Sequence, residues 1–381
     1  MLAIINATLV LHDRLQPESW LLAEEGKIVS LGQMKSAPSF AGAEVYDAKG
    51  RFVGPGLVDI HCHAGGTTWF YEDPEKAARY LLENGTTTVL PTLYFSMTQE
   101  ELVRNFATLQ EAWRAGKTPN VAGFYTEAPY MNPKFGADRE NNPWNGPIRR
   151  EEYMPVLEQA GQDARVWVVA PEREHIEEFV KDALAVNPNV RFAVGHSEAT
   201  PYEVEALIPY GLCIGTHHTN ATGMLPKYPE CRGVCVDEAV WYHDDIYAEI
   251  ICDRMGIHVD PYMQRLVRKI KGQDRIILIS DACVFDGPVP EVGDYDGATD
   301  ILFDWSGEIA GSKLLLRDSC RNWGKHTGAG LVEVFRAASY NPAQATGFTD
   351  RGEIVPGKRA DLIVIDGDFT LHQVIFAGDL I

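Results

Sequence analysis

The sequence predicts an α/β fold: a (β/α)8 TIM-type barrel, residues 53–346, beside a small β-sandwich domain built from both chain ends, residues 1–52 and 347–381. Two observations predict it. From residue 54 to about residue 345, apolar runs alternate with amphipathic stretches of helical period, which is typical of repeated βα units and a parallel sheet. The two chain ends carry glycine-punctuated strand patterns of like character, so we expect them to pair with each other.

The individual elements follow in chain order. Three runs with turns predict the first strands: LAIINATLVL (2–11), SWLLAEEGKIVSLG (19–32) and AEVYDAKGRFVGPG (43–56). The barrel strands include TTTVLPTLY (86–94), NVAGFYTE (120–127), RVWVVAPE (165–172), VRFAVGHS (190–197), LCIGTHH (212–218), IYAEIICD (246–253) and RIILISDA (275–282). Helices are predicted in such segments as PEKAARYLLENG (74–85) and PYMQRLVRKIKG (261–272), and the tail from residue 351 returns to strands. So many βα units in about 290 residues fit a barrel better than an open sheet.

Composition and charge exclude several classes of protein. The chain has 34 basic and 54 acidic residues, a formal charge of −20, which argues against nucleic-acid and membrane partners because phosphate surfaces attract basic proteins. No apolar run reaches membrane-spanning length, and the opening segment does not fit a secretory signal, so we expect a soluble protein. Seven scattered cysteines form neither an even disulfide framework nor a CxxC pair, which favours reduced thiols in the cytoplasm.

The strongest local signal is GPGLVDIHCHAGG, where a short apolar strand ends in His61-Cys62-His63. On a strand, residues i and i+2 point to the same side, so both imidazoles can reach one metal ion. Imidazole is a favoured ligand of zinc, iron and related divalent ions. Two unrelated strand histidines are the alternative, and an isolated HxH does not decide between them.

Four later strand ends decide it. Glu127 ends VAGFYTE, His196 follows RFAVG, His217 follows LCIG, and Asp281 follows RIILIS. Any one of these could be a surface residue, but in a parallel barrel all of these ends meet at one mouth. The ordered set therefore predicts a metal site at that mouth. His218 faces the opposite way from His217 in an extended segment, which indicates a structural role.

These residues lie in motifs that resemble the amidohydrolase superfamily and, within it, the N-acetylglucosamine-6-phosphate deacetylases. The resemblance covers nearly the whole chain, through PGLVDIHCHAGG, TEAPYMNPKFGA, VGHSEAT, THHTNA, the IHV around His258, SDA, AGS (310–312), NPAQATG and GEIVPGKRADLIVID. It implies a (β/α)8 barrel beside a β-sandwich, in agreement with the fold predicted from the residues.

The resemblance also implies a ligand set. His61 and His63 would hold one divalent ion, His196 and His217 a second, with Glu127 bridging them, while Asp281 would be both ligand and the acid–base group. Relatives that bind one ion have usually lost the first histidine pair, so retention of this pair predicts that two ions can bind. Zinc is expected, and iron or manganese remain open.

The implied substrate contacts are His258, Asn220 and Ala221. For His258 a purely structural role stays open. Relatives complete each active site with residues of a neighbouring subunit, so the resemblance implies a homodimer.

The chain departs from the family pattern in the loops that would hold phosphate. Asp138 stands where the family commonly has a substrate-binding histidine, and a carboxylate there would repel phosphate. The family's phosphate-binding arginine has no clean counterpart, and Arg232 or Lys227 could replace it.

Three functions remain open. The first is hydrolysis of the acetamide of an N-acetyl amino sugar, namely N-acetylglucosamine-6-phosphate, to the amine and acetate. The second is hydrolysis of another N-acyl or cyclic amide, including unphosphorylated or N-acetylgalactosamine-type sugars. The third is a non-catalytic scaffold, which the intact set of expected ligands disfavours. Aromatic residues in the loops suit stacking on a sugar ring, although loop aromatics more often pack. They are Trp69, Phe70, Tyr71, Tyr130, Trp144, Trp241 and Tyr242.

Overall fold

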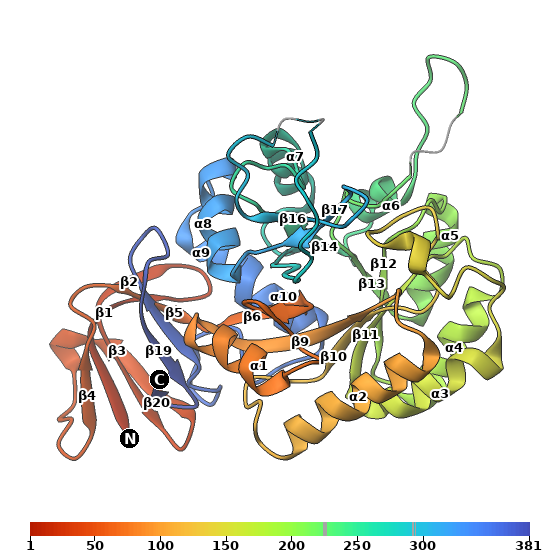
Figure 1. The fold of residues 1–381 in the computed structure, drawn as a ribbon. Coiled ribbons are helices and arrows are strands. Elements are labelled where there is room, and N and C mark those ends of the chain that lie inside the picture. Colours follow the sequence, from red (N-terminus) through yellow and green to blue (C-terminus); the bar gives the residue numbers. More distant parts are fainter. Residues whose placement is uncertain (224–226, 292, 294) are drawn as a thin grey trace.

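A computed structural model gives the fold and describes residues 1–223, 227–291, 293 and 295–381. Eight parallel strands form one sheet in the order β15-β14-β13-β12-β11-β10-β9-β6. They are β6 (Leu57–Cys62), β9 (Thr86–Tyr94), β10 (Phe124–Glu127), β11 (Ala164–Val169), β12 (Arg191–Val194), β13 (Leu212–Gly215), β14 (Tyr247–Ile251) and β15 (Ile276–Ile279). The sheet curls into a nearly closed barrel (Figure 1), which confirms the predicted fold class.

The barrel closes between its first and last strands through the segments that follow them. The Asp281 N–H donates to the His61 carbonyl oxygen at 3.0 Å, and the His63 N–H donates to the Ala282 carbonyl oxygen at 2.9 Å. Two of the predicted metal ligands and the predicted acid–base residue therefore lie at the seam of the barrel.

A helix follows each strand and covers the outside of the barrel, as parallel strands require. The helices are α1 (Pro74–Glu83), α2 (Gln99–Arg114), α3 (Arg150–Ala160), α4 (Ile176–Val186), α5 (Pro201–Leu207), α6 (Val236–Tyr242), α7 (Pro261–Lys271) and α8 (Leu316–Thr327). Side chains that accept from the first-turn N–H groups fix where several of them begin, such as Thr98 and Thr200 in capping boxes. The loops between the strand ends and the helix starts are left to form a site at the carboxyl end of the barrel.

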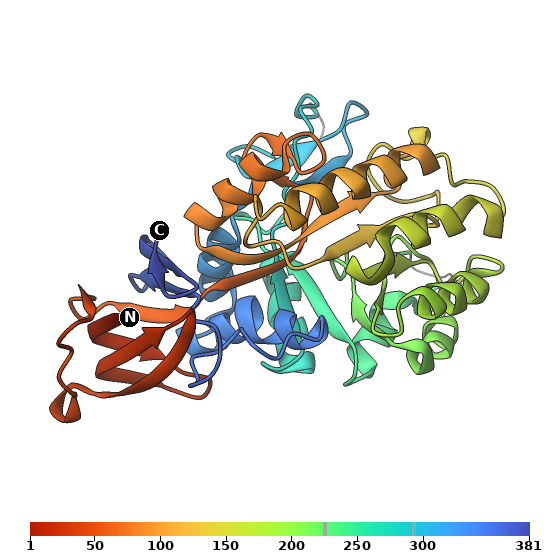
Figure 2. The same ribbon diagram turned by 90° about the horizontal axis from the view of Figure 1, so that it is seen from below.

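The chain ends form a second sheet of eight strands beside the barrel (Figure 2). They are β1 (Leu2–Val10), β2 (Leu15–Glu24), β3 (Lys27–Gln33), β4 (Glu44–Asp47), β5 (Phe52–Pro55), β18 (Leu362–Ile365), β19 (Leu371–Phe376) and β20 (Asp379–Leu380). The pairing of β5 with both β1 and β18 joins the two ends. This sheet has its own buried core, which includes Ile4, Leu21, Val53 and Leu362. The predicted domain boundary at residue 52 stays a prediction. Strand β5, which pairs within this sheet, spans Phe52–Pro55 and so crosses that boundary.

Short elements complete the fold. They are the ribbons β7 (Ala64–Gly65) with β8 (Thr68–Trp69) and β16 (Ile301–Phe303) with β17 (Ile309–Ser312), and the final helices α9 (Leu331–Phe335) and α10 (Asn341–Ala345). None of the helices in the described part of the chain combines the length and apolar character that a membrane span requires.

Candidate metal centre

The predicted ligands from five strand ends lie together at the barrel mouth. On one side, Oε1 of Glu127 lies 2.5 Å from Nε2 of His196 and 2.9 Å from Nε2 of His217. The two imidazole Nε2 atoms are 3.0 Å apart. Three atoms with lone pairs thus converge on one point, which is the geometry of a cation site.

The other oxygen of Glu127 faces the first histidine pair. Oε2 lies 3.6 Å from Nε2 of His63 and 3.8 Å from Nε2 of His61. Oδ1 of Asp281 is 3.2 Å from Nε2 of His63 and 3.6 Å from Nε2 of His61. Glu127 therefore lies between the two histidine pairs and presents one oxygen to each, as a bridging carboxylate does.

The donor set fits divalent ions. All six residues are at most 8% exposed, and the two groups His61–His63–Glu127 and Glu127–His196–His217 each place their ligand atoms within 4.8 Å of one another. Nε2 of His61 is buried and has no hydrogen-bond partner among the residues that the structure describes. An orphaned buried nitrogen is costly unless a proton donor or a metal ion meets it, and mixed imidazole and carboxylate ligands suit zinc and iron.

Charge within the cluster is balanced internally. Burial opposes ionisation of Glu127, but the adjacent histidines, His196 first, outweigh it and hold the pKa of this carboxyl well below its ordinary value. The pKa of Asp281 is likewise lowered despite burial, through the hydrogen bond with His63 and the charges of His61 and His63. Both carboxylates are therefore ionised at neutral pH, which is the state that binds a cation.

Three of these residues adopt a backbone conformation that side chains rarely take. His196, His217 and Asp281 have φ values of 45°, 29° and 48°. Left-handed backbone at a residue other than glycine costs about 1–3 kcal/mol and concentrates at functional sites. Here it follows directly after a strand and turns each side chain toward the mouth.

Partners on the other imidazole nitrogen orient the first histidine pair. Nδ1 of His61 lies 3.2 Å from Oε2 of Glu249, and Nδ1 of His63 lies 3.1 Å from the Thr92 carbonyl oxygen. Because Nδ1 is engaged, the Nε2 lone pair is left for a metal ion. Glu249 was not among the predicted site residues. The one sign of Glu249 in the sequence is an acidic residue inside the apolar run IYAEII. In the structure Glu249 lies on β14 and is 0% exposed.

A cavity of about 550 Å³ opens above the cluster. His258, Asn220 and Ala221, the predicted substrate contacts, line it together with Trp69. The Asp253 carboxylate holds His258, accepting from its backbone N–H at 2.9 Å and lying 3.2 Å from its Nδ1. The second imidazole nitrogen, Nε2, is buried and has no hydrogen-bond partner among the described residues.

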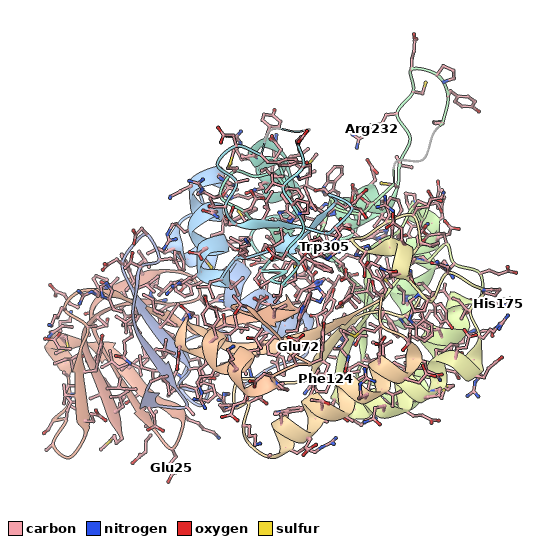
Figure 3. The ribbon with its side chains drawn as sticks, viewed as in Figure 1. Glu25, Glu72, Phe124, His175, Arg232 and Trp305 are labelled. Atoms are coloured by element: carbon pink, nitrogen blue, oxygen red, sulfur yellow. The ribbon has the colours of Figure 1, made fainter. Side chains whose placement is uncertain are left out.

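The remaining two predicted contacts, Asp138 and Arg232, are not among the residues that line this cavity. The Asp138 carboxylate accepts from the Asn141 amide at 2.6 Å. Arg232 pairs with Glu238 at 2.6 Å and belongs to a segment that projects from the barrel (Figures 1 and 3). Both remain predictions as substrate contacts.

His218 points away from the cluster, as its position beside His217 predicts. Its ring is 1% exposed, packs edge-on against Trp241 and lies 3.5 Å from an Asp237 oxygen. Burial lowers the pKa of His218 to about 3, so the ring is neutral. This is a packing residue rather than a ligand.

Comparison with known proteins gives a consistent picture. The model of the amidohydrolase family matches residues 52–381. The N-acetylglucosamine-6-phosphate deacetylase of Lysinibacillus sphaericus is 27% identical over 384 residues, which cover 95% of this chain and 92% of that protein. The N-acetylgalactosamine-6-phosphate deacetylase of Escherichia coli O157:H7 is 28% identical, and the match covers 86% of each.

A solved structure extends the similarity to three dimensions. A variant of the N-acetyl-D-glucosamine-6-phosphate deacetylase of Mycobacterium smegmatis, in complex with N-acetyl-D-glucosamine-6-phosphate, matches with a TM-score of 0.83 at 26% identity. The match covers 100% of this chain and 98% of that one. The similarity includes both the barrel and the terminal sheet.

Proposed function

The chain belongs to the amidohydrolase family, and from this premise we propose that it hydrolyses the acetamide of N-acetylglucosamine-6-phosphate to glucosamine-6-phosphate and acetate. One observation carries the proposal. Two buried histidine pairs face opposite oxygens of Glu127, with Asp281 beside them at the floor of a cavity. Such a site suits hydrolysis of a carbon–nitrogen bond, and relatives over most of the chain are sugar-phosphate deacetylases.

Glu127 and the four histidines would hold one or two divalent ions, and we propose zinc. When bound there, such an ion would lower the pKa of water and polarise a carbonyl oxygen. Asp281 then has two tasks. Its carboxylate takes a proton from the water that attacks the carbonyl carbon, and it returns this proton to the nitrogen as the C–N bond breaks. Proton return matters because an amide anion is a poor leaving group.

The cavity residues would hold the sugar. We propose that Nε2 of His258 and the Asn220–Ala221 segment contact the substrate, since all three line the cavity next to His217. Trp69 stacks on Tyr94, with ring centroids 5.6 Å apart, and both line the same cavity. Flat aromatic faces of this kind suit a pyranose ring.

We further propose a homodimer in which Arg232 reaches the cavity of the neighbouring subunit. Arg232 is remote from its own cavity on the projecting segment, with 67% of its side chain exposed, so it is available to a neighbour. As for the compartment, the seven cysteines are free thiols, and we propose the cytoplasm because reduced cysteines are usual there.

An acetate-release assay tests the activity. The purified enzyme, loaded with Zn²⁺, is given the 6-phosphates of N-acetylglucosamine and N-acetylgalactosamine and the two unphosphorylated sugars. We expect the highest kcat/KM for N-acetylglucosamine-6-phosphate. N-acetylgalactosamine-6-phosphate is the second candidate substrate, because one of the relatives is named as its deacetylase. Turnover of unphosphorylated sugars alone would contradict the proposed substrate, and absence of any turnover would favour a scaffold.

A further inference from the structure

Two cavity walls run from the metal centre to one ion pair at the outer end of the cavity. The first wall is residues 136–139, in the loop after β10, and the second is residues 308–311, which lead into and form β17. At their inner ends both walls are glycines. At their outer ends Arg139 donates from Nη2 to Oε1 of Glu308 at 2.8 Å.

The inner ends touch the catalytic residues closely. A Cβ on Gly136 would lie 2.8 Å from Nδ1 of His196, and a Cβ on Gly311 would lie 3.3 Å from Oδ2 of Asp281. Both glycines have positive φ, 96° and 69°. From Gly311 to Glu308 is three residues of extended chain, or about 10 Å at about 3.3 Å per residue. The ion pair therefore lies about 10 Å of backbone away from Gly311, the residue beside the acid–base group.

The chain turns Arg139, and not Asp138, toward this cavity. Asp138 has a φ of 56°, and its N–H donates to Oδ2 of Asp304 at 2.9 Å, across to the β16–β17 hairpin. Its carboxylate is engaged by Asn141. Asp138, which the sequence places opposite a phosphate, is thus not among the residues that line the cavity, whereas the next residue, Arg139, lines it.

Arg139 has donors to spare. The contact with Glu308 uses Nη2, while a guanidinium has five N–H groups in a planar fork that suits phosphate oxygens. Lys134 is the other lysine or arginine among the described residues that line the cavity, but its side chain is 65% exposed and pairs with Glu198. The Arg139 side chain is 33% exposed and lies at the end of a wall that starts at a metal ligand.

We propose that Arg139 binds the substrate's 6-phosphate from within its own subunit, and that Glu308 holds its guanidinium in place. The proposal rests on the proposed function, which puts the 2-acetamido group at the metal centre and the 6-phosphate at the far side of the ring. Glu308 also carries a negative charge beside that phosphate, so it weakens phosphate binding while it positions Arg139.

Kinetics on the zinc-loaded enzyme test this with the variants Arg139→Met, Glu308→Gln, Ser306→Ala and Lys134→Met. Arg139→Met should lower the kcat/KM preference for N-acetylglucosamine-6-phosphate over N-acetylglucosamine by about 10- to 100-fold, the loss expected for a charged hydrogen bond. Glu308→Gln keeps an acceptor for Arg139 and removes the charge, so KM for the phosphorylated sugar should fall by about 1.5- to 5-fold. Ser306→Ala removes a neighbouring contact between the same two segments, that of Ser306 with Glu140 at 3.2 Å, and should preserve the preference.

Other outcomes would overturn the proposal. One is that Arg139→Met lowers kcat/KM equally for the phosphorylated and the unphosphorylated sugar. Another is that Lys134→Met loses the preference for the phosphorylated sugar while Arg139→Met keeps it. The third is that Glu308→Gln changes this preference as much as Arg139→Met does. Thermal-shift titration with glucosamine-6-phosphate and glucosamine separates this question from catalysis. If the enzyme turns over no acetamide, the proposed function fails, yet a phosphate-dependent shift that Arg139→Met abolishes still supports the site. If Arg139→Met keeps full turnover and an unchanged thermal shift with glucosamine-6-phosphate, the role of Arg139 is wrong while the proposed function stands.

Discussion

Oε2 of Glu249 lies 3.2 Å from Nδ1 of His61, and it also lies 3.2 Å from the backbone nitrogen of His217, which donates to it. One buried carboxylate thus fixes a ligand from each of the two histidine pairs. The side chain of His61 is 0% exposed, as is that of Glu249, so no water competes for this contact. We expect Glu249 to act as a positioning residue that couples the two halves of the candidate metal centre.

The first prediction concerns this coupling. Glu249→Gln should lower metal affinity by about 10- to 100-fold, because a carboxylate behind a histidine fixes its tautomer and raises its basicity. Competition with a fluorescent zinc chelator measures it. Glu205→Gln is the matched control, since Glu205 also contacts an imidazole, that of His243 at 3.0 Å, but outside the site. Equal affinities in the two variants would remove Glu249 from the metal centre.

The second prediction concerns Asp281. Asp281→Asn should lower kcat by about 100- to 10,000-fold, the range expected for loss of an acid–base group, and should retain metal. Elemental analysis and acetate release, made on the same preparation, check both parts. Near-normal turnover in this variant would show that another group moves the proton.

The third prediction is the number of ions. Wild-type protein should bind two Zn²⁺, and the double variant His61→Asn/His63→Asn should bind one, because the Glu127–His196–His217 group survives intact. At a free concentration about a thousandfold above Kd, each bound ion adds about 4 kcal/mol to the free energy of unfolding. Chelation should therefore lower Tm, and Zn²⁺ should restore it. A single ion in the wild type would mean that Glu127 does not bridge.

Much of the fold and site follows from local sequence. The barrel strands are apolar runs bounded by turn signals, and TTTVLPTLY coincides with β9, Thr86–Tyr94. The parallel arrangement then brings all carboxyl ends to one mouth, so residues at strand ends such as Glu127 and His217 can be grouped without knowing a single contact. The direction of His218 follows equally from the two-residue period of an extended segment.

Long-range partners and loop direction could not be predicted. A buried acid within a strand, such as Glu249, has no sequence signature that identifies His61, 188 residues away, as its partner. In the loop after β10, Asp138 has a left-handed backbone, and its N–H donates to the carboxylate of Asp304, 166 residues further along. Tertiary contacts of this kind decide whether residue 138 or residue 139 faces the cavity.

The fourth prediction tests the homodimer by complementation. Arg232→Ala and Asp281→Asn are each expected to be impaired, but a mixture of the two should regain activity. In a mixed dimer the Arg232→Ala chain keeps Asp281 and receives the partner's Arg232. Arg139 acts within its own chain, so mixing Arg139→Met with Asp281→Asn should give no recovery. Recovery after co-refolding is measured by acetate release, and failure of the first mixture would count against Arg232 acting across subunits.

The final prediction is a pH dependence of stability at Asp237, next to the packing histidine. Burial raises the pKa of Asp237 from 3.8 to about 6, and the hydrogen bond from Thr222 offsets only part of this. Neutral His218 supplies no positive charge to Asp237. The negative charge of Glu238, the next residue in the chain, raises the pKa of Asp237 further. The folded chain therefore holds a proton on this carboxyl at pH values where the unfolded chain has lost it.

The sign of the effect follows by linkage. Because the folded pKa lies above the unfolded one, the favourable contribution is complete below about pH 4 and is lost as the pH rises through about 6. The full loss is about 3 kcal/mol, and partial exposure of the carboxyl reduces it. Asp237→Asn keeps an acceptor for Thr222 and removes the titration. It should thus be more stable than wild type by about 1–3 kcal/mol at neutral pH and nearly equal at about pH 4. Urea unfolding of both proteins across this range measures the gap, and a gap that stays constant with pH would mean that Asp237 titrates normally.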